Sequence, residues 1–321
     1  MKSIVIAGVD GGASSTRCLA VETSSWRVAA CKSGPSNILS AGPETTLLSV
    51  EEAFNGALRK LGCDEAEVAA LCLSGAWTAG RRLEKLFKGK IRAAKILVKS
   101  DVEAAAAACL GLDEQGIIVI AGTGSVVLGV SGGSFFRAGG WGHVFNDEGG
   151  AYSVSIEALR AAFQSYDGRG SRTSLVEEAK KFFKARSMEE LARRVHEMRK
   201  EHIALFAKKV KAEAENGDMV ARRIIEDAAK SLSRGVLAVA GKMKLTRGDE
   251  LNIYLVGGMF NGHPDILARR IRKHLSLEYG KIKVRRPAYP PAVGALLIAF
   301  REAGLNPPTR VLKKAASMGC E

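Results

Sequence analysis

The sequence predicts an α/β protein made of two similar lobes. Strand-like and helix-like segments alternate along the chain, which is typical of open α/β sheets. Two segments, residues 4–22 and 117–130, also share one pattern. Each is an apolar strand, a turn of glycine and hydroxyl residues, and a second strand. The shared pattern indicates a duplicated unit.

The first half of the chain has the element order of one such lobe. Strands are expected at 4–10, 16–22, 26–32, 68–74 and 95–99, and helices at 43–61, 80–87 and 101–110. Pro43 near the first turn and Gly62 past the end are typical of helix boundaries. The β-β-β-α-β-α-β-α order is the ribonuclease-H-like plan.

The second half repeats this order with an insertion. Strands are expected near 117–122, 124–130, 133–138, 251–256 and 281–284, and helices at 151–165, 218–243, 264–275 and 291–303. We expect an N-terminal lobe at 1–115, joined by the C-terminal helix 291–304, and a C-terminal lobe at 116–290 with a helical insertion at 171–216. A cleft would separate the lobes. The tail beyond Pro308 is expected to be loose.

Composition excludes several classes of protein. The 321 residues suffice for two domains with cores, and no apolar run is long enough to span a membrane. The start, Met1-Lys-Ser, does not read as a signal peptide. Cysteines at 18, 31, 63, 72, 109 and 320 have no metal-like spacing. They are expected to be reduced, in a cytoplasmic protein.

The net charge of +14 raises the possibility of nucleic-acid binding. The excess lies largely between Lys180 and Lys211, where glutamates are also frequent. This mixture favours a solvated helical face, so no nucleic-acid partner is expected.

The first hairpin turn contains the candidate phosphate site of the N-terminal half. The apolar strand ends in Asp10-Gly11-Gly12-Ala13-Ser14-Ser15-Thr16. A second strand follows, so the turn fits neither a dinucleotide-binding motif nor a Walker loop, both of which open a helix. Its backbone N–H groups suit a phosphate, and Asp10 at the strand end suits a hydrated Mg²⁺. An ordinary Gly-Gly hairpin is the alternative.

The turn Gly122-Thr123-Gly124-Ser125 repeats this pattern, so two lobes could hold one polyphosphate between their turns. The pair resembles the two phosphate motifs of the superfamily of sugar kinases, actin and heat-shock chaperone ATPases. The resemblance implies an actin-like ATPase fold that binds ATP. A bulky residue at Gly124 is expected to weaken ATP binding and spare the apo fold, and any positive φ there would add strain.

The stretch from Gly139 to Tyr152 is the most specific one, because its five glycines flank Trp141, His143 and two carboxylates. Trp141 could offer a flat wall to a sugar. Asp147 could accept hydrogen bonds from sugar hydroxyls, or it could cap a helix. The stretch resembles the N-acetylglucosamine kinase branch of the BadF/BadG-type ATPase family, whose element order matches over nearly the whole chain.

This resemblance assigns further residues. It implies that Gly140, Trp141, Asp147 and Asn37 bind sugar and that Gly257-Gly258-Met259 contacts adenosine. Without the resemblance, Asn37 would be interpreted as an ordinary turn asparagine. The segment Ala13–Ser15 departs from the family, which often has Gly-Thr-Lys there, so the side chain that meets the β-phosphate stays open. His143 is expected to order its loop.

Asp101 follows the strand 95–99 and opens an alanine-rich helix. On its own it would be a helix N-cap. The resemblance favours a catalytic base, because the sugar kinases place their catalytic Asp at this strand-to-helix junction. In this role Asp101 would also bind the sugar.

The sequence therefore predicts an ATP-dependent kinase that phosphorylates a small-molecule amino sugar, N-acetylglucosamine or glucosamine, at O6 by in-line transfer with Mg²⁺. Relatives in this branch are commonly homodimers. One alternative is an iron–sulfur ATPase that activates acyl-CoA dehydratases, but residues 139–150 contain no cysteine for its cluster. A nucleotide switch without enzyme activity is the other.

Overall fold

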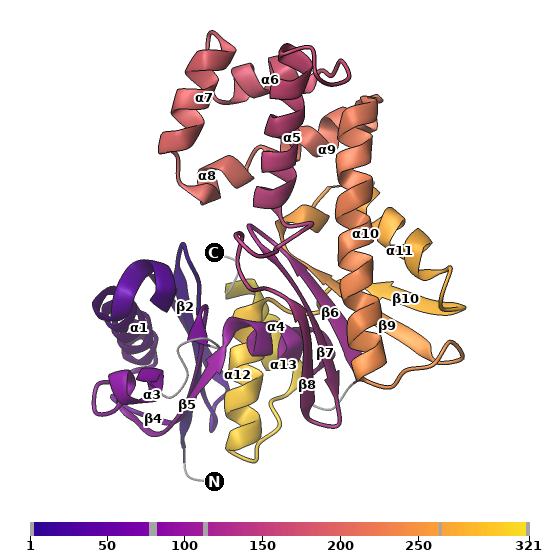
Figure 1. Ribbon diagram of the computed structural model, residues 1–321. Coiled ribbons are helices and arrows are strands. Elements are labelled where there is room, and N and C mark those ends of the chain that lie inside the picture. Colours follow the sequence, from indigo (N-terminus) through magenta and orange to yellow (C-terminus); the bar gives the residue numbers. More distant parts are fainter. Residues whose placement is uncertain (1–2, 77–81, 112–114, 263–264, 319–321) are drawn as a thin grey trace. The chain divides into compact units, whose positions relative to one another are not determined.

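The computed structural model describes residues 3–76, 82–111, 115–262 and 265–318. The chain divides into two compact units, which we call unit 1 (Met1–Glu114 with Pro287–Glu321) and unit 2 (Gln115–Arg286). Each described unit contains one five-stranded mixed sheet with helices packed against it (Figure 1).

The sheet of unit 1 brings three strand ends to one edge. Its strands are β1 (Val5–Gly11), β2 (Thr16–Glu22), β3 (Arg27–Ser33), β4 (Ala66–Leu73) and β5 (Ala93–Ser100), in the order β3-β2-β1-β4-β5. Strands β1, β4 and β5 are parallel, and Asp10 pairs with Cys72, which pairs with Lys99. The residues that follow these three strands therefore lie close together.

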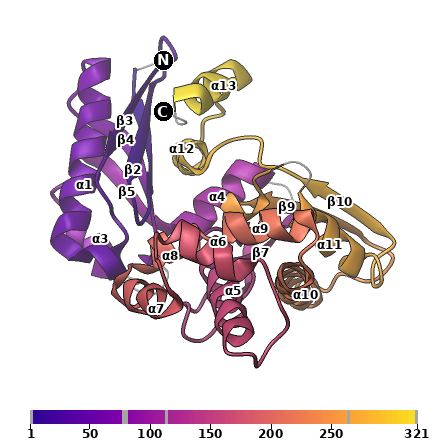
Figure 2. The same cartoon turned by 90° about the horizontal axis from the view of Figure 1, so that it is seen from above.

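Helices cover both faces of this sheet because its apolar residues alternate. Ala7 and Val9 face the core under α1 (Ile38–Leu61), whereas Ile6 faces α12 (Pro291–Glu302) and α13 (Thr309–Met318) (Figure 2). Helices α3 (Arg82–Phe87) and α4 (Asp101–Leu110) complete the unit. Gly8 is required where α12 crosses β1, since a Cβ there would lie 2.2 Å from the backbone nitrogen of Leu296.

Unit 2 repeats the strand order of unit 1. Its strands are β6 (Gly116–Ala121), β7 (Ser125–Ser131), β8 (Ser134–Gly139), β9 (Glu250–Val256) and β10 (Lys281–Arg285), in the order β10-β9-β6-β7-β8. The short helix η1 (Gly258–Phe260), α10 (Met219–Lys242) and α11 (Ile266–Leu275) follow the same plan. The repeated hairpin pattern thus corresponds to a repeated sheet.

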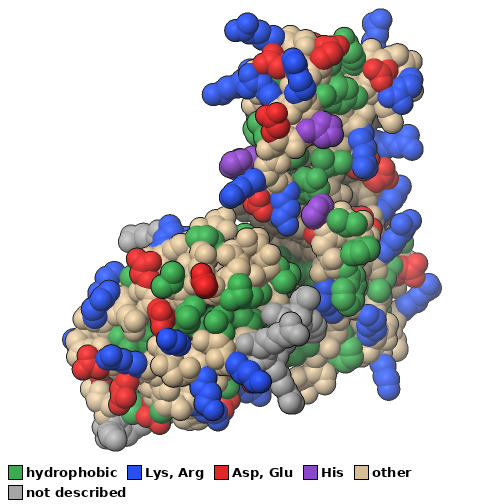
Figure 3. All heavy atoms as spheres, turned by 60° about the vertical axis from the view of Figure 1, so that its left-hand side comes forward, with side chains coloured by type: hydrophobic (Ala, Val, Ile, Leu, Met, Phe, Trp, Pro, Cys, Tyr) green, Lys and Arg blue, Asp and Glu red, His purple; other side chains and the backbone are tan. Residues whose placement is uncertain are grey.

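The helical insertion of unit 2 is a set of short helices. It comprises α6 (Leu175–Phe182), α7 (Met188–Glu197), α8 (Lys200–Ala204) and α9 (Ala207–Asn216), after α5 (Ala151–Tyr166). Figure 3 shows Lys and Arg side chains projecting from this part, with Asp and Glu between them. Several form ion pairs with glutamates, such as Lys180 with Glu177 and Lys209 with Glu178. No helix in the described residues is long and apolar enough to cross a membrane.

One detail of the predicted elements was wrong. The tail is helical rather than loose, because Val311 and Ala315 of α13 are buried in the core of unit 1. The predicted helix start at Pro43 follows a break at Gly42, where φ is 80° and ψ is 168°, and a short helical segment from Ile38, with Asn37 as its N-cap, precedes this break. The predicted end at Gly62, in the left-handed region, is confirmed.

Candidate functional site

Two carboxyl groups lie at the sheet edge of unit 1. Asp10 ends β1, and Asp101 follows β5 as the first residue of α4. Burial and then the nearby Asp101 raise the pKa of Asp10 to about 7, while Arg17 opposes the shift. Burial also raises the pKa of Asp101. The two groups are thus close enough to disfavour ionisation of both.

A chain of hydrogen bonds fixes the Asp101 carboxylate. The Nδ2 of Asn37 donates to the Oγ of Ser74 at 3.2 Å, and the Ser74 hydroxyl bonds to Asp101, which lowers the pKa of Asp101 against the effect of burial. The backbone N–H of Val102 donates to Oδ1 of Asp101 at 3.0 Å. The site therefore includes Ser74, a polar residue at the end of β4 that the sequence analysis missed.

The alternative of Asp101 as an N-cap is wrong. The cap of α4 is Ser100, whose side chain accepts from the backbone N–H of Glu103, while the Glu103 side chain accepts from the backbone of Ser100. Asp101 is thus not needed to begin the helix, and its carboxylate is oriented by Ser74 instead.

The first predicted phosphate turn is held in shape from within unit 1. The carbonyl of Gly12 accepts from the backbone N–H groups of Ser36 at 2.9 Å and Asn37 at 3.1 Å. Thr16 differs from its neighbours, because its buried hydroxyl lies 2.6 Å from the Oγ of Ser36 and 2.7 Å from the carbonyl oxygen of Gly34. Its side chain holds the turn, whereas Ala13 and Ser14 are exposed at the tip.

The donor chemistry of this edge fits Mg²⁺. Asp10 and Asp101 offer hard carboxylate oxygens, and Mg²⁺ in kinases commonly takes one or two carboxylates together with water and phosphate. The described residues contain no cluster of three or more His, Cys, Asp or Glu that would enclose a metal. An ion held by few protein ligands matches this arrangement.

Asp10→Asn should make the apo protein more stable at pH 8 while abolishing Mg²⁺-dependent activity. The folded state raises the pKa of Asp10 to about 7, so folding favours the protonated form of this carboxyl group. The stability linked to this preference is complete below about pH 4 and is lost as the pH rises through 7. Urea unfolding with EDTA should show the variant about 4 kcal/mol more stable at pH 8 and close to wild type at pH 4. A variant that is less stable at pH 8 would contradict the assignment.

The second predicted phosphate turn, in unit 2, is hydrogen-bonded to the start of α5. Gly122 donates to the carbonyl of Gly124 at 2.9 Å, and the carbonyls of Gly122 and Thr123 accept from Ala151 and Tyr152. The Oγ of Ser125 donates to the carbonyl of Glu148 at 2.7 Å. The turn and the segment after Trp141 thus form one connected structure.

Asp147 lies against this turn. It has a positive φ of 71°, and the Oδ1 of Asn146 accepts from the backbone N–H groups of both Trp141 and Asp147 at 2.9 Å. The N-cap of α5 is Gly150, so the alternative of Asp147 as a helix cap is wrong. Burial raises the pKa of Asp147, and backbone hydrogen bonds with Ser125 and Gly142 oppose this shift.

Trp141 stands at the surface of unit 2. It is 67% exposed, and the guanidinium of Arg137 lies 4.2 Å from the centre of its ring. Gly140 has a φ of 72°, which a residue with a Cβ rarely adopts. His143 packs edge-on against Tyr152 with ring centres 5.3 Å apart, in agreement with its expected part in ordering the loop. An exposed aromatic ring with a guanidinium stacked on it offers a flat surface on which a ligand ring can pack.

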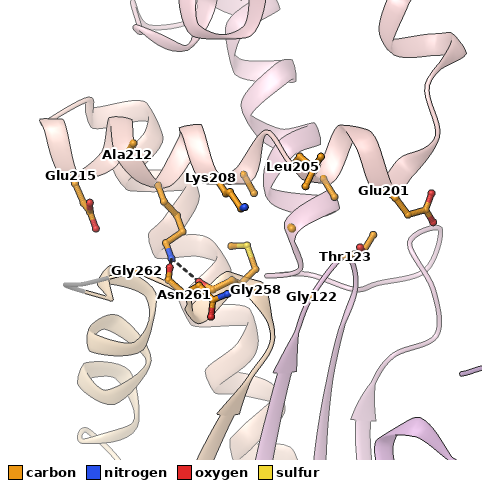
Figure 4. Close-up of a pocket in the computed structure, with 15 residues that line it drawn as sticks. Gly122, Thr123, Glu201, Leu205, Lys208, Ala212, Glu215, Gly258, Asn261 and Gly262 are labelled. Atoms are coloured by element: carbon orange, nitrogen blue, oxygen red, sulfur yellow. Dashed lines mark hydrogen bonds between the residues drawn. The ribbon is translucent and has the colours of Figure 1, made fainter. Parts of the chain in front are cut away.

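A pocket of about 510 Å³ lies beside the second turn, which is large enough for a nucleoside (Figure 4). The predicted phosphate residues Gly122 and Thr123 and the predicted adenosine residues Gly258 and Met259 all line it. The two motifs lie in contact at Gly257, because a Cβ there would lie 2.4 Å from the carbonyl oxygen of Ala121, the residue before Gly122. Its φ of 108° also favours glycine.

The opposite wall of the pocket comes from the helical insertion, to which the sequence analysis assigned no site residue. Its residues from α8, α9 and the turn between them are Glu201, Ala204, Leu205, Ala207, Lys208, Lys211, Ala212 and Glu215. The repeated alanines leave space beside the glycine turns. Alanines in an amphipathic helix look the same whether they face a core or a ligand, so the sequence did not reveal this wall.

Gly122→Val should fold but lose ATP binding by at least about tenfold, measured by calorimetric titration. A Cβ at Gly122 meets no atom within 4 Å, and its φ is not positive, so the side chain would extend into open pocket space. Normal ATP affinity in a folded variant would exclude this pocket as the nucleotide site.

Gly124 is not the clean test that the sequence suggested. Its φ is not positive, and a Cβ there would lie 2.4 Å from Oδ2 of Asp147. A substitution would displace the Asp147 carboxylate, so a loss of ATP affinity in that variant could not be attributed to the turn alone.

Two ribonuclease-H-like units that each carry a glycine turn at a sheet edge define the class of actin-like ATPases and sugar kinases. The chain belongs to the BadF/BadG/BcrA/BcrD ATPase family, whose model matches residues 7–299. Membership of an ATPase family implies that the protein uses ATP.

Individual relatives are similar over nearly their whole length. An N-acetylmuramic acid/N-acetylglucosamine kinase of Clostridium acetobutylicum is 33% identical, over 94% of this chain and 99% of the relative. An N-acetyl-D-glucosamine kinase of Dictyostelium discoideum is 26% identical with the same shares covered. The crystal structure of a candidate N-acetylglucosamine kinase from Chromobacterium violaceum matches with a TM-score of 0.74 at 23% identity, over 92% of this chain and 99% of that chain.

These comparisons confirm the predicted family, the predicted fold class and the predicted enzyme class, a sugar kinase. They give no support to the alternative of an iron–sulfur activator, since the curated relatives are sugar kinases. They do not assign roles to individual residues.

Proposed function

We propose that this protein transfers the γ-phosphoryl group of ATP to O6 of an amino sugar, N-acetylglucosamine or glucosamine, with Asp101 as the general base. The observation that carries the proposal is the Asp101 carboxyl, which lies at the sheet edge with its pKa raised by burial and its position fixed by Ser74. A base is most effective when its pKa lies near the working pH.

Residues of unit 1 would orient the acceptor hydroxyl. Asp101 would accept a hydrogen bond from O6 and then take its proton as the bond to phosphorus forms. Asn37 donates one N–H to Ser74, and its Oδ1 accepts from the backbone of Leu39. The second N–H of its amide and the other Oδ1 lone pair suit a sugar hydroxyl.

The nucleotide would be bound by backbone groups. Gly11, Gly12, Ala13, Ser14 and Ser15 of the first turn and Gly122, Thr123, Gly124 and Ser125 of the second would face phosphates, and Gly257, Gly258 and Met259 the adenosine. Asp10 would hold a hydrated Mg²⁺, which supplies positive charge to the transferring phosphate. Gly140, Trp141 and Asp147 would contact the sugar. The predicted homodimer stays a prediction.

Asp101→Asn is the direct test of the base. Ser100 and Glu103 still cap α4, and the asparagine still accepts from Ser74, so the variant should be at least as stable to urea as wild type, and the dissociation constant of ATP should stay near wild type. The kcat with N-acetylglucosamine in a coupled assay should fall at least ~10²–10⁴-fold, because an amide cannot take the proton. Near-normal kcat in a stable variant would remove Asp101 as the base and leave Asp147 as the next candidate.

The cations around Asp147 favour a second sugar as phosphoryl acceptor, one that carries a carboxylate. Lys200 and His143 both lower the pKa of Asp147, and Arg137 is near enough to feel its charge. N-acetylmuramic acid is N-acetylglucosamine with an added lactyl carboxylate, and the relative from Clostridium acetobutylicum is named for both sugars. We propose that the exposed Lys200 attracts this carboxylate.

Lys200→Ala should therefore lower kcat/KM for N-acetylmuramic acid by about three- to tenfold and leave kcat/KM for N-acetylglucosamine unchanged. The difference should shrink in 0.5 M salt, because an exposed charge pair is screened. Equal decreases in kcat/KM for the two sugars would show that Lys200 does not interact with the carboxylate.

A further inference from the structure

Lys211 is a buried lysine that the proposed reaction does not use. It lies in α9, and only 8% of its surface is exposed, although its neighbour Lys208 on the same helix is exposed. Burying an ammonium group costs free energy unless the group is well hydrogen-bonded. Burial lowers the pKa of Lys211, and the carboxylates of Asp265 and Glu215 oppose this shift. Its partners should therefore explain its position.

Those partners are backbone carbonyls in the loop after β9. The Nζ of Lys211 donates to the carbonyl oxygen of Met259 at 2.8 Å and to that of Asn261 at 2.7 Å (Figure 4). The carbonyl between them, on Phe260, accepts from Nη2 of Arg286. Two cations thus bind three consecutive carbonyls.

The two cations fasten the loop to different elements. Arg286 follows β10 and also donates to Oδ2 of Asp265, the N-cap residue of α11, at 2.8 Å. It therefore ties the loop to the sheet side of unit 2. Lys211 ties the same loop to α9 of the helical insertion.

Lys211 therefore connects two walls of one pocket. Gly258, Met259 and Asn261 line the pocket on the loop side, and Lys208 and Ala212 line it on the α9 side. In Figure 4 the labelled residues Lys208 and Ala212 lie on the helical ribbon facing Gly258 and Asn261. The two hydrogen bonds of Lys211 hold these walls together.

We propose that Lys211 is a positioning residue of the nucleotide site, which sets the width of the adenosine pocket by binding the carbonyls of Met259 and Asn261. The proposal rests on the proposed function, because it takes this pocket as the nucleotide site. It gives the basic insertion a defined role as one wall of that site. Lys211 acts through the loop and needs no contact with phosphate.

The test compares Lys211→Met with Lys211→Gln, both of which remove the charge. Methionine keeps an apolar stem without donors, whereas glutamine keeps two N–H donors on a stem one atom shorter. Calorimetric titration should show ATP binding ~10–100-fold weaker for Lys211→Met, as expected for lost charge-assisted hydrogen bonds, and within about fivefold of wild type for Lys211→Gln. The kcat at saturating ATP and the KM for the sugar should stay near wild type, which a general loss of structure would not allow.

Lys209→Met is the matched control, because it removes an ammonium from the same helix at a position that does not line the pocket, and it should keep wild-type ATP affinity. If Lys211 only attracted the polyphosphate by charge, Lys211→Gln would lose as much affinity as Lys211→Met, and the proposal would be wrong. Wild-type affinity in Lys211→Met would also overturn it. If Lys211→Met does not fold, Lys211→Ala replaces it, since water can then reach the carbonyls, and the same loss is expected.

The Gly122→Val variant separates this proposal from the assignment of the pocket. Loss of ATP binding in Gly122→Val together with wild-type affinity in Lys211→Met would reject only the role of Lys211. Normal ATP affinity in both variants would reject the pocket as the nucleotide site.

Discussion

Two partly buried carboxyl groups at one sheet edge are the constraint on which unit 1 depends. Parallel pairing of β1, β4 and β5 brings Asp10 and Asp101 together, and partial burial strengthens the repulsion between their charges. Each group alone would prefer water. The surrounding structure compensates locally through Arg17 beside Asp10 and through Ser74 and Val102 at Asp101. Groups with pKa values shifted in this way are concentrated at functional sites.

Much of the fold could be predicted because its determinants are local. Alternating apolar segments marked the strands, Gly62 marked the end of α1, and the hairpin repeated at 117–130 indicated two sheets of equal topology. Asp10 could be found as a candidate in the same way, because a polar residue directly after an apolar run is visible in the sequence. The role of Asp101 was predicted only from the resemblance to the sugar kinases.

Residues whose role depends on packing could not be assigned this way. Whether Ser100 or Asp101 caps α4, and whether Asp147 or Gly150 precedes α5 as its cap, differs only by backbone angles set in the folded state. Ser74 matters because Asn37, far away in sequence, reaches it. Lys211 looks like any lysine of a basic helix until the carbonyls of Met259 and Asn261 are placed beside it. Likewise, the two buried apolar positions of α13 were too few to predict its packing on unit 1.

Unit 1 is discontinuous in the chain, since α12 follows the whole of unit 2. The side chains of Leu296 and Phe300 are fully buried against β1 and β2 residues, including Ile6 and Leu19. During synthesis the first sheet must therefore wait, with one apolar face uncovered, until the last elements leave the ribosome. Unit 2 is continuous and can close its own core earlier. The order of folding is thus the reverse of the order of the units, and the long-range closure of unit 1 should be the slow step.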